Sequence, residues 1–146
     1  MLTNKQVMPT LPATDVKRAK QFYEEKLGLK TVEEDEGGVL LKAGANTMLY
    51  LYKRSATKAD HTVAAFDVED IEYQVNELKS RGVRFEDYNL PDMGIKTENS
   101  IATMPMGSEA TKAAWFKDSE GNILGIQQLP RSMQERQKAR MAAAMA

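Results

Sequence analysis

Asp15-Val-Lys-Arg-Ala-Lys-Gln-Phe-Tyr23, followed by Leu27-Gly-Leu29, is the stretch that decides the fold, because a related stretch occurs later in the chain. The later copy is Asp70-Ile-Glu-Tyr-Gln-Val75, followed by Arg81-Gly-Val83. Each copy combines an acidic helix start, an amphipathic helix and a glycine stop before a new strand. A chain that repeats one unit usually pairs the units about a shared surface, so function is expected there.

Each unit is predicted to fold as β-α-β-β-β. In the first unit, a helix begins at Thr14 or Asp15 and ends at Gly28, and strands are expected at residues 6–11, 30–35, 39–43 and 47–53. In the second unit, a helix runs from Asp70 to Gly82, and strands are expected at residues 62–68, 83–88, 112–117 and 123–128. The fold class is therefore α+β, with two tandem units that form a curved mixed sheet around a cavity.

The segment 89–111, rich in Gly, Pro and Met, is predicted to be a long loop, with a short strand possible at 101–104. We expect this loop to cover one mouth of the cavity, where Lys96, Met104, Met106 and Glu109 would reach a ligand. The alternative is a solvated loop without a ligand role.

Composition narrows the class of protein. The 146 residues include no cysteine and carry a formal net charge of −1. Disulfides, thiolate nucleophiles and zinc–thiolate sites are therefore excluded, and neither nucleic acid nor a membrane is an expected partner. No apolar run is long enough for a transmembrane helix and no signal peptide is evident, so a cytoplasmic protein is expected.

One main domain is expected at residues 1–130, with units at 5–53 and 61–128, followed by a helical tail at 131–146. Ser132 is a candidate N-cap for the tail helix, which is expected to run through Arg140. The tail is expected either to rest on its own domain or to pack on a partner subunit.

The paired units resemble the vicinal oxygen chelate superfamily, which includes glyoxalases, bleomycin-resistance proteins and extradiol dioxygenases. Three stretches carry the resemblance: Leu11 to Leu29, Phe66 to Val83, and Trp115-Phe-Lys-Asp-Ser-Glu-Gly-Asn-Ile123. The resemblance covers about residues 6–128. It implies half-barrel units, a cavity and frequent dimers, but it does not identify a reaction, because this fold hosts many activities.

Metal-dependent members of that family place His, Gln or Glu ligands on the first and last strands of each unit. Carried over by the family motifs, those positions are Pro9, Tyr50, Val63 and Gly125. None of these residues is a competent ligand for a divalent ion, and a tyrosine alone would not hold one. The resemblance therefore implies no metal and no other cofactor.

Strand alternation and the resemblance together predict a ligand-binding set made of Met48, Tyr50, Tyr52, His61, Val63, Trp115, Gly125 and Gln127. Such a set combines an apolar body with a few orienting hydrogen-bonding groups, which is typical of small-molecule pockets. The alternative is that these aromatic residues belong only to the core. His61, the single histidine, and Tyr50 are the weak candidates for proton transfer.

Three functions fit these residues. The first is a metal-free, homodimeric small-molecule-binding protein of the bleomycin-resistance kind. The second is a lyase, dioxygenase or thiol transferase of the same superfamily. The third is a non-enzymatic interaction module.

Overall fold

The computed structural model describes residues 1–145 and has the predicted α+β architecture, with two mixed sheets. Position 146, the last residue of the predicted tail, lies outside the described residues. No helix in this part of the chain is long and apolar enough to cross a membrane.

The first module forms a four-stranded sheet in the order β1-β4-β3-β2, with β1 parallel to β4. Asp15 caps its helix by accepting a hydrogen bond from the Arg18 backbone N–H, and Gly28 stops the helix with a φ of 75°. The elements are β1 (Thr10–Ala13), α1 (Val16–Glu25), β2 (Lys30–Asp35), β3 (Gly38–Lys42), the 3-10 turn η1 (Gly44–Asn46) and β4 (Met48–Lys53).

The second module repeats this arrangement and extends it to six strands in the order β5-β10-β9-β8-β7-β6, with β5 parallel to β10. Asp70 caps its helix through the Tyr73 backbone N–H, as predicted from the repeat. The elements are β5 (Thr62–Asp67), α2 (Ile71–Ser80), β6 (Asn89–Leu90), the 3-10 turn η2 (Pro91–Met93), β7 (Ile95–Glu98), β8 (Ile101–Met106), β9 (Glu109–Lys117) and β10 (Ile123–Gln128).

The long loop predicted at 89–111 is wrong over most of its length, because strands form there. The short strand considered possible at 101–104 is confirmed and extends to Met106 as β8. A turn at Asn99 and Ser100, both with positive φ, joins β7 to β8, and β8 pairs with the start of β9. Glu109, expected to reach a ligand, instead accepts hydrogen bonds from the tail helix. The Gly, Pro and Met content of the segment concealed a series of pairings between consecutive strands joined by short turns.

Two predicted strands are also corrected. The strand expected at 83–88 is reduced to one bridge between Phe85 and Phe116. The strand expected at 6–11 lies at Thr10–Ala13 and includes Pro12, which is tolerated because β1 is an edge strand.

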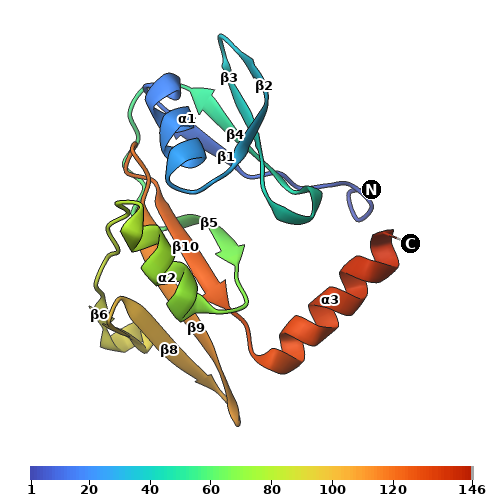
Figure 1. Cartoon of the computed structure of the whole chain (residues 1–146), viewed down its shortest axis with the longest axis vertical. Coiled ribbons are helices and arrows are strands. Elements are labelled where there is room, and N and C mark those ends of the chain that lie inside the picture. Colours follow the sequence, from blue (N-terminus) through green and yellow to red (C-terminus); the bar gives the residue numbers. More distant parts are fainter. Residues whose placement is uncertain (146) are drawn as a thin grey trace.

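Each module has one helix-covered face. Figure 1 shows α1 and α2 lying across their sheets on the same side of the molecule, with the two sheets one after the other along its long axis. Under the helices, the core includes the fully buried Tyr23, Leu51, Ile71, Phe116 and Leu124. The opposite side of each sheet carries no helix of its own module, and we call it the helix-free face.

The two modules are joined by a polar junction at the β9–β10 turn. The carboxylate of Asp118, only 6% exposed, accepts a hydrogen bond from Tyr23 Oη at 2.7 Å. The Asn122 amide donates to the same carboxylate at 2.9 Å and to the Pro12 carbonyl at 3.1 Å. Burial, followed by the nearby negative charge of Asp118, raises the pKa of Tyr23, so its hydroxyl remains a donor.

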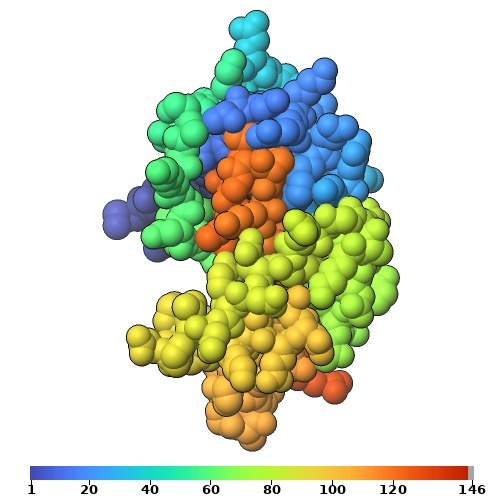
Figure 2. Space-filling model, turned by 90° about the vertical axis from the view of Figure 1, so that its left-hand side faces the viewer, coloured from blue at the N-terminus to red at the C-terminus, as the bar shows by residue number. Residues whose placement is uncertain are grey.

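Glu120 completes the polar junction at the start of α1. Its carboxylate accepts hydrogen bonds from the Thr14 backbone N–H (2.6 Å) and hydroxyl (2.8 Å), and it forms an ion pair with Arg18 at 2.7 Å. Figure 2 shows the orange β9–β10 segment set against the blue first module. A carboxylate at this position also complements the positive end of the helix dipole.

The tail forms the predicted C-terminal helix, α3 (Arg131–Met145). Ser132, predicted as its N-cap, instead lies within the first turn. Its backbone N–H and hydroxyl donate to Glu109 at 3.2 and 2.6 Å, so a carboxylate from β9 satisfies the helix start. Lys138 forms an ion pair with Glu69 at 2.7 Å, which holds α3 near the end of β5.

We predict that Glu120→Gln lowers the free energy of unfolding by about 1–3 kcal/mol at pH 7 and reduces its acid dependence. Burial alone would raise the pKa of Glu120, but hydrogen bonds from Thr14, Arg18 and Asp15 outweigh it, so the net pKa is lowered. A lowered folded-state pKa gives stabilisation that is present above the unfolded-state pKa and lost as the pH falls through the folded-state pKa. Urea unfolding between pH 7 and pH 3 measures both effects.

The control for this measurement is Glu36→Gln, which alters an exposed carboxylate in the β2–β3 turn. We expect the control to follow the wild-type curve within about 0.5 kcal/mol. If Glu120→Gln also ran parallel to the wild-type curve at every pH, the polar junction would not have the energetic role assigned to it.

Candidate functional site

The helix-free face of the first module is centred on Tyr50. A Cβ atom at Gly38 would lie only 2.6 Å from Tyr50 Oη, so the glycine makes room for the tyrosine ring. Tyr50, Gly38, Leu40 and Met8 line a hollow of about 490 Å³, which the acidic residues of β2 border. The hollow therefore combines an aromatic ring, aliphatic surface and a phenol that can orient a polar group.

The helix-free face of the second module is centred on Trp115. A Cβ atom at Gly125 would lie 3.5 Å from Trp115 Cδ1, so the indole passes over a residue without a side chain. The Tyr88 ring meets the indole edge to face, with ring centroids 5.3 Å apart and an interplanar angle of 66°. Trp115 and Tyr88 are both partly exposed, which leaves aromatic surface available for contact.

The two faces present aromatic rings at equivalent places in their modules. Tyr50 on β4 is paired directly with Leu40 on β3, and Gly125 on β10 is paired directly with Trp115 on β9. The large ring is carried by the last strand in one module and by the neighbouring strand in the other. Tyr50 and Trp115 lie on different sheets, so the predicted ligand-binding residues divide into two groups.

Tyr88 and Met8 were missed by the sequence reasoning. Tyr88 follows the single bridge at Phe85, outside any regular strand, so alternation gives no indication of its direction. Burial, and secondarily the charge of Glu86, raises the pKa of Tyr88, so its phenol is protonated and available as a donor near neutral pH.

Met48 and Tyr52, on β4, alternate with the buried Leu49 and Leu51 and therefore lie on the same helix-free face as Tyr50. Gln127, on β10, shares the face of Gly125, where its side-chain amide donates to Asp67 at 2.7 Å.

Val63 does not lie beside Gly125. The register of β5 against β10 shifts between Ile123 and Leu124, and Val63 packs against the core instead. Ala65 and Thr62 are the residues that approach Gly125, each with a side-chain carbon 3.6 Å from a Cβ placed there. The bulge, which alternation cannot predict, explains the difference.

His61 lies at the surface just before β5. Its side chain is 72% exposed, and its Nδ1 lies 3.5 Å from the fully exposed Asp60 carboxylate. The structure therefore brings His61 to neither Tyr50 nor Trp115.

The residues at the four positions expected for metal ligands do not fit a divalent ion. Pro9, Val63 and Gly125 offer no side-chain donor, which leaves Tyr50 as the one potential ligand among the four positions. Acidic residues of β2 border the hollow of Tyr50, but they form no metal-binding group of three or more side chains in the described part of the chain. Among residues 1–145, no group of three or more His, Asp or Glu side chains could hold a metal ion.

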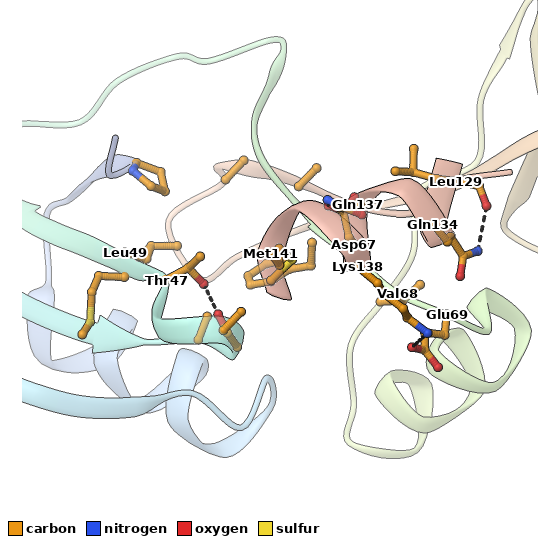
Figure 3. A pocket seen from close by; sticks show the side chains of 18 of the residues that line it. Thr47, Leu49, Asp67, Val68, Glu69, Leu129, Gln134, Gln137, Lys138 and Met141 are labelled. Atoms are coloured by element: carbon orange, nitrogen blue, oxygen red, sulfur yellow. Dashed lines mark hydrogen bonds and ion pairs between the residues drawn. The ribbon is translucent and has the colours of Figure 1, made fainter. Parts of the chain in front are cut away.

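A third concavity lies between the modules beneath α3. This groove has a volume of about 580 Å³ and is bordered by the start of β4, the end of β5 and α3. In Figure 3, Met141 lies towards Thr47 and Leu49 of the first module, whereas Lys138 reaches Glu69 near α2. Asp67 already accepts hydrogen bonds from Gln127 and Gln137, so the groove offers mainly apolar surface.

Comparisons with solved structures agree with this fold. A glyoxalase/bleomycin resistance protein/dioxygenase from Alicyclobacillus acidocaldarius is 19% identical, with a TM-score of 0.60 over 86% of this chain and 91% of that one. A lactoylglutathione lyase from Agrobacterium tumefaciens is 20% identical, with a TM-score of 0.57 over 86% and 93% of the two chains. TnmS3, an antibiotic-binding protein from Streptomyces sp. CB03234, is 20% identical, with a TM-score of 0.61 over 88% and 98%.

At these identities the solved structures establish the fold alone. No curated protein matches the chain. The family model named Glyoxalase/Bleomycin resistance protein/Dioxygenase superfamily matches residues 5–126, which include both modules. The chain therefore belongs to the glyoxalase/bleomycin resistance protein/dioxygenase superfamily.

Proposed function

We propose that the protein binds a small molecule with an aromatic or other apolar body, without a metal ion, on its helix-free faces. The observation that carries this proposal is the equivalent placement of Tyr50 and Trp115, one aromatic ring on each face. Each ring is given its position by a glycine, Gly38 or Gly125, and each remains partly exposed. Aromatic rings bind apolar ligands through large contact areas at a small cost in side-chain entropy.

The neighbouring groups suit this role. Met48 and Leu40 add adaptable aliphatic surface to the first face, and Met104 does so for the second. The phenols of Tyr50, Tyr52 and Tyr88 and the Gln127 amide supply hydrogen bonds that would orient a ligand. Antibiotic binding by TnmS3 indicates that this fold can serve such a function.

The residues at the expected metal positions support a metal-independent mode of binding. Proline, valine and glycine cannot replace His or Glu as ligands, so the Lewis-acid chemistry of metal-dependent relatives has no donors in this chain at those positions. An enzyme that uses Tyr50 or His61 for proton transfer, as a lyase, dioxygenase or thiol transferase, is the first alternative. A non-enzymatic interaction module is the second.

We predict that Tyr50→Ala weakens binding of an aromatic ligand at least about tenfold, because it removes a ring that would contact the ligand. Trp115 is the only tryptophan, so its fluorescence reports on the second face while aromatic metabolites and aromatic antibiotics are titrated. The affinity of each variant is then measured by calorimetry with the compound that quenches most strongly.

Tyr73→Ala is the matched control, because Tyr73 is a 64% exposed tyrosine on α2, away from both helix-free faces. We expect this control to bind within about twofold of the wild type. If every compound left the Trp115 emission unchanged, the interaction-module alternative would replace the proposal. Turnover of a bound compound that Tyr50→Phe abolishes would favour the enzyme.

We further propose that the binding cavity is completed in a homodimer, where the first-module face of one copy opposes the second-module face of the other. The two faces belong to sheets that lie one after the other in a single chain, so one copy does not place them opposite each other (Figure 1). Met8 and Val32, at the first sheet, are 41% and 46% exposed, which is consistent with a surface that a partner covers.

Sedimentation equilibrium tests this assembly directly. A dimer predicts a mass of twice the 16.3 kDa of one chain. Val32→Asp should shift the equilibrium towards the monomer, because it places a charge in the interface. A wild-type protein that stays monomeric at high micromolar concentration would contradict the dimer while leaving ligand binding to be tested separately.

A further inference from the structure

The first module contains a turn equivalent to the one that forms the polar junction. η1 joins β3 to β4 as the β9–β10 turn joins the last two strands of the second module. In both turns the first residue donates its backbone N–H to the carbonyl of the fifth at 2.9 Å: Ala43 to Thr47, and Asp118 to Asn122. The repeat therefore places two such turns between the modules, one at each side.

The carboxylates and the phenol of the junction have no counterparts at the first module's turn, and Thr47, in place of Asn122, donates its hydroxyl hydrogen bond within its own turn. Counting along the equivalent turns, Ala43 stands in place of Asp118 and Ala45 in place of Glu120. Counting from the first residue of each helix, Leu78 of α2 stands in place of Tyr23 of α1. We call this second contact region the open junction, because it lacks the phenol and both carboxylates that close the first.

A cavity of about 470 Å³ lies at the open junction, on the helix-covered side of the second sheet. This volume is within the range of small-molecule sites. Its apolar lining comes from the α1–β2 connection, the end of β5, α2, β9 and β10: Leu27, Leu29, Phe66, Leu78, Phe116 and Ile126.

The rim of this cavity carries two lysines. Lys30 and Lys42 both line the cavity and are direct cross-strand partners in the β2–β3 pair. Like charges placed opposite each other on one side of a sheet repel, because their Cβ atoms lie about 4.5–5.5 Å apart. Neither lysine takes part in an ion pair with a described carboxylate.

The remaining polar groups of the cavity cancel this charge only in part. Gln74 is neutral, and its side chain can donate a hydrogen bond. Asp67, the one carboxylate in the lining, offsets one of the two charges, but it accepts hydrogen bonds from the amides of Gln127 and Gln137 and forms no ion pair with either lysine, so the lining keeps a net positive charge. An anion held between Lys30 and Lys42 would relieve their mutual repulsion and would leave an attached apolar group on the floor of the cavity.

We propose that the open junction is a second ligand site, which binds a small organic anion with an apolar body, such as a medium-chain or aromatic carboxylate or sulfonate. The acidic group lies between Lys30 and Lys42, and the apolar body lies against Phe66 and Leu78. The apolar wall of this site belongs to the helix-covered side of the second sheet, whereas Lys30 and Lys42 stand on the same face of the first sheet as Met48. Its lining includes neither Tyr50 nor Trp115, so the site does not depend on the function proposed for them.

Decanoate, used below its aggregation concentration, tests the charge requirement in the full-length protein by calorimetry. We expect decanol, which has the same chain without the charge, to bind at least about tenfold more weakly. The double variant Lys30→Gln/Lys42→Gln should weaken decanoate binding at least about tenfold, because it removes both partners of the carboxylate.

Lys117→Gln is the matched control, because Lys117 occupies the position equivalent to Lys42 at the polar junction. Its affinity for decanoate should stay within about twofold of the wild type. Circular dichroism of each variant verifies that these surface substitutions leave the fold intact. Equal affinities for decanoate and decanol, or equal losses in the control and the double variant, would overturn the proposal.

Nuclear magnetic resonance identifies where decanoate binds. The proposal predicts amide shifts at Leu27, Gly28 and Leu29 and an unchanged Trp115 indole signal. Shifts at the Trp115 indole without any at Leu27–Leu29 would overturn the second site and would support binding on the helix-free face. If decanoate shifted neither the Leu27–Leu29 amides nor the Trp115 indole, the second site would also be overturned. The titration with aromatic compounds tests the proposed function independently.

Discussion

The buried contact between Tyr23 and Asp118 is the interaction on which the arrangement of the two modules depends. Asp118 is almost wholly removed from water, and its carboxylate is satisfied by Tyr23, by Asn122 and by backbone N–H groups of its own turn. A charge buried without such partners would be costly, so the turn is stable only when it is docked on α1. The orientation of the second sheet relative to the first follows from this requirement.

A second set of contacts between the modules is made by the C-terminal ends of α1 and α2. Arg81, after α2, reaches the carbonyl of Glu25 at the end of α1, and Lys26, after α1, reaches the Gly82 carbonyl, each at 3.5 Å. Cations are favourable near carbonyls that a helix leaves free at its C-terminus. Since the helices and the polar junction lie on one side, both helix-free faces remain available for binding.

The repeat made the frame of the fold predictable, because its signals are local. Asp15 and Asp70 cap the helices, and Gly28 and Gly82 stop them, as the spacing indicates. Alternation placed Tyr50 and Gly125 on the inward side of their strands and the resemblance added Trp115, and contact of these residues with a ligand stays a prediction. Alternation failed at Val63, where a bulge shifts the register, and between Asn89 and Met106, where pairing joins strands that local composition does not identify. Tyr88 and His61 lie outside regular strands, so the alternation of residues along a strand could predict neither where the Tyr88 side chain points nor that His61 is exposed.

This chain has the superfamily fold, and we propose that the residues at the positions of the usual metal ligands, Pro9, Tyr50, Val63 and Gly125, do not bind a divalent metal ion. The most direct test is elemental analysis by mass spectrometry of protein purified without a chelator and after exposure to equimolar nickel, iron, manganese or zinc. The account predicts well below one equivalent of each metal per chain after desalting. One retained equivalent of any of them, lost again on removal of a candidate ligand side chain, would contradict it.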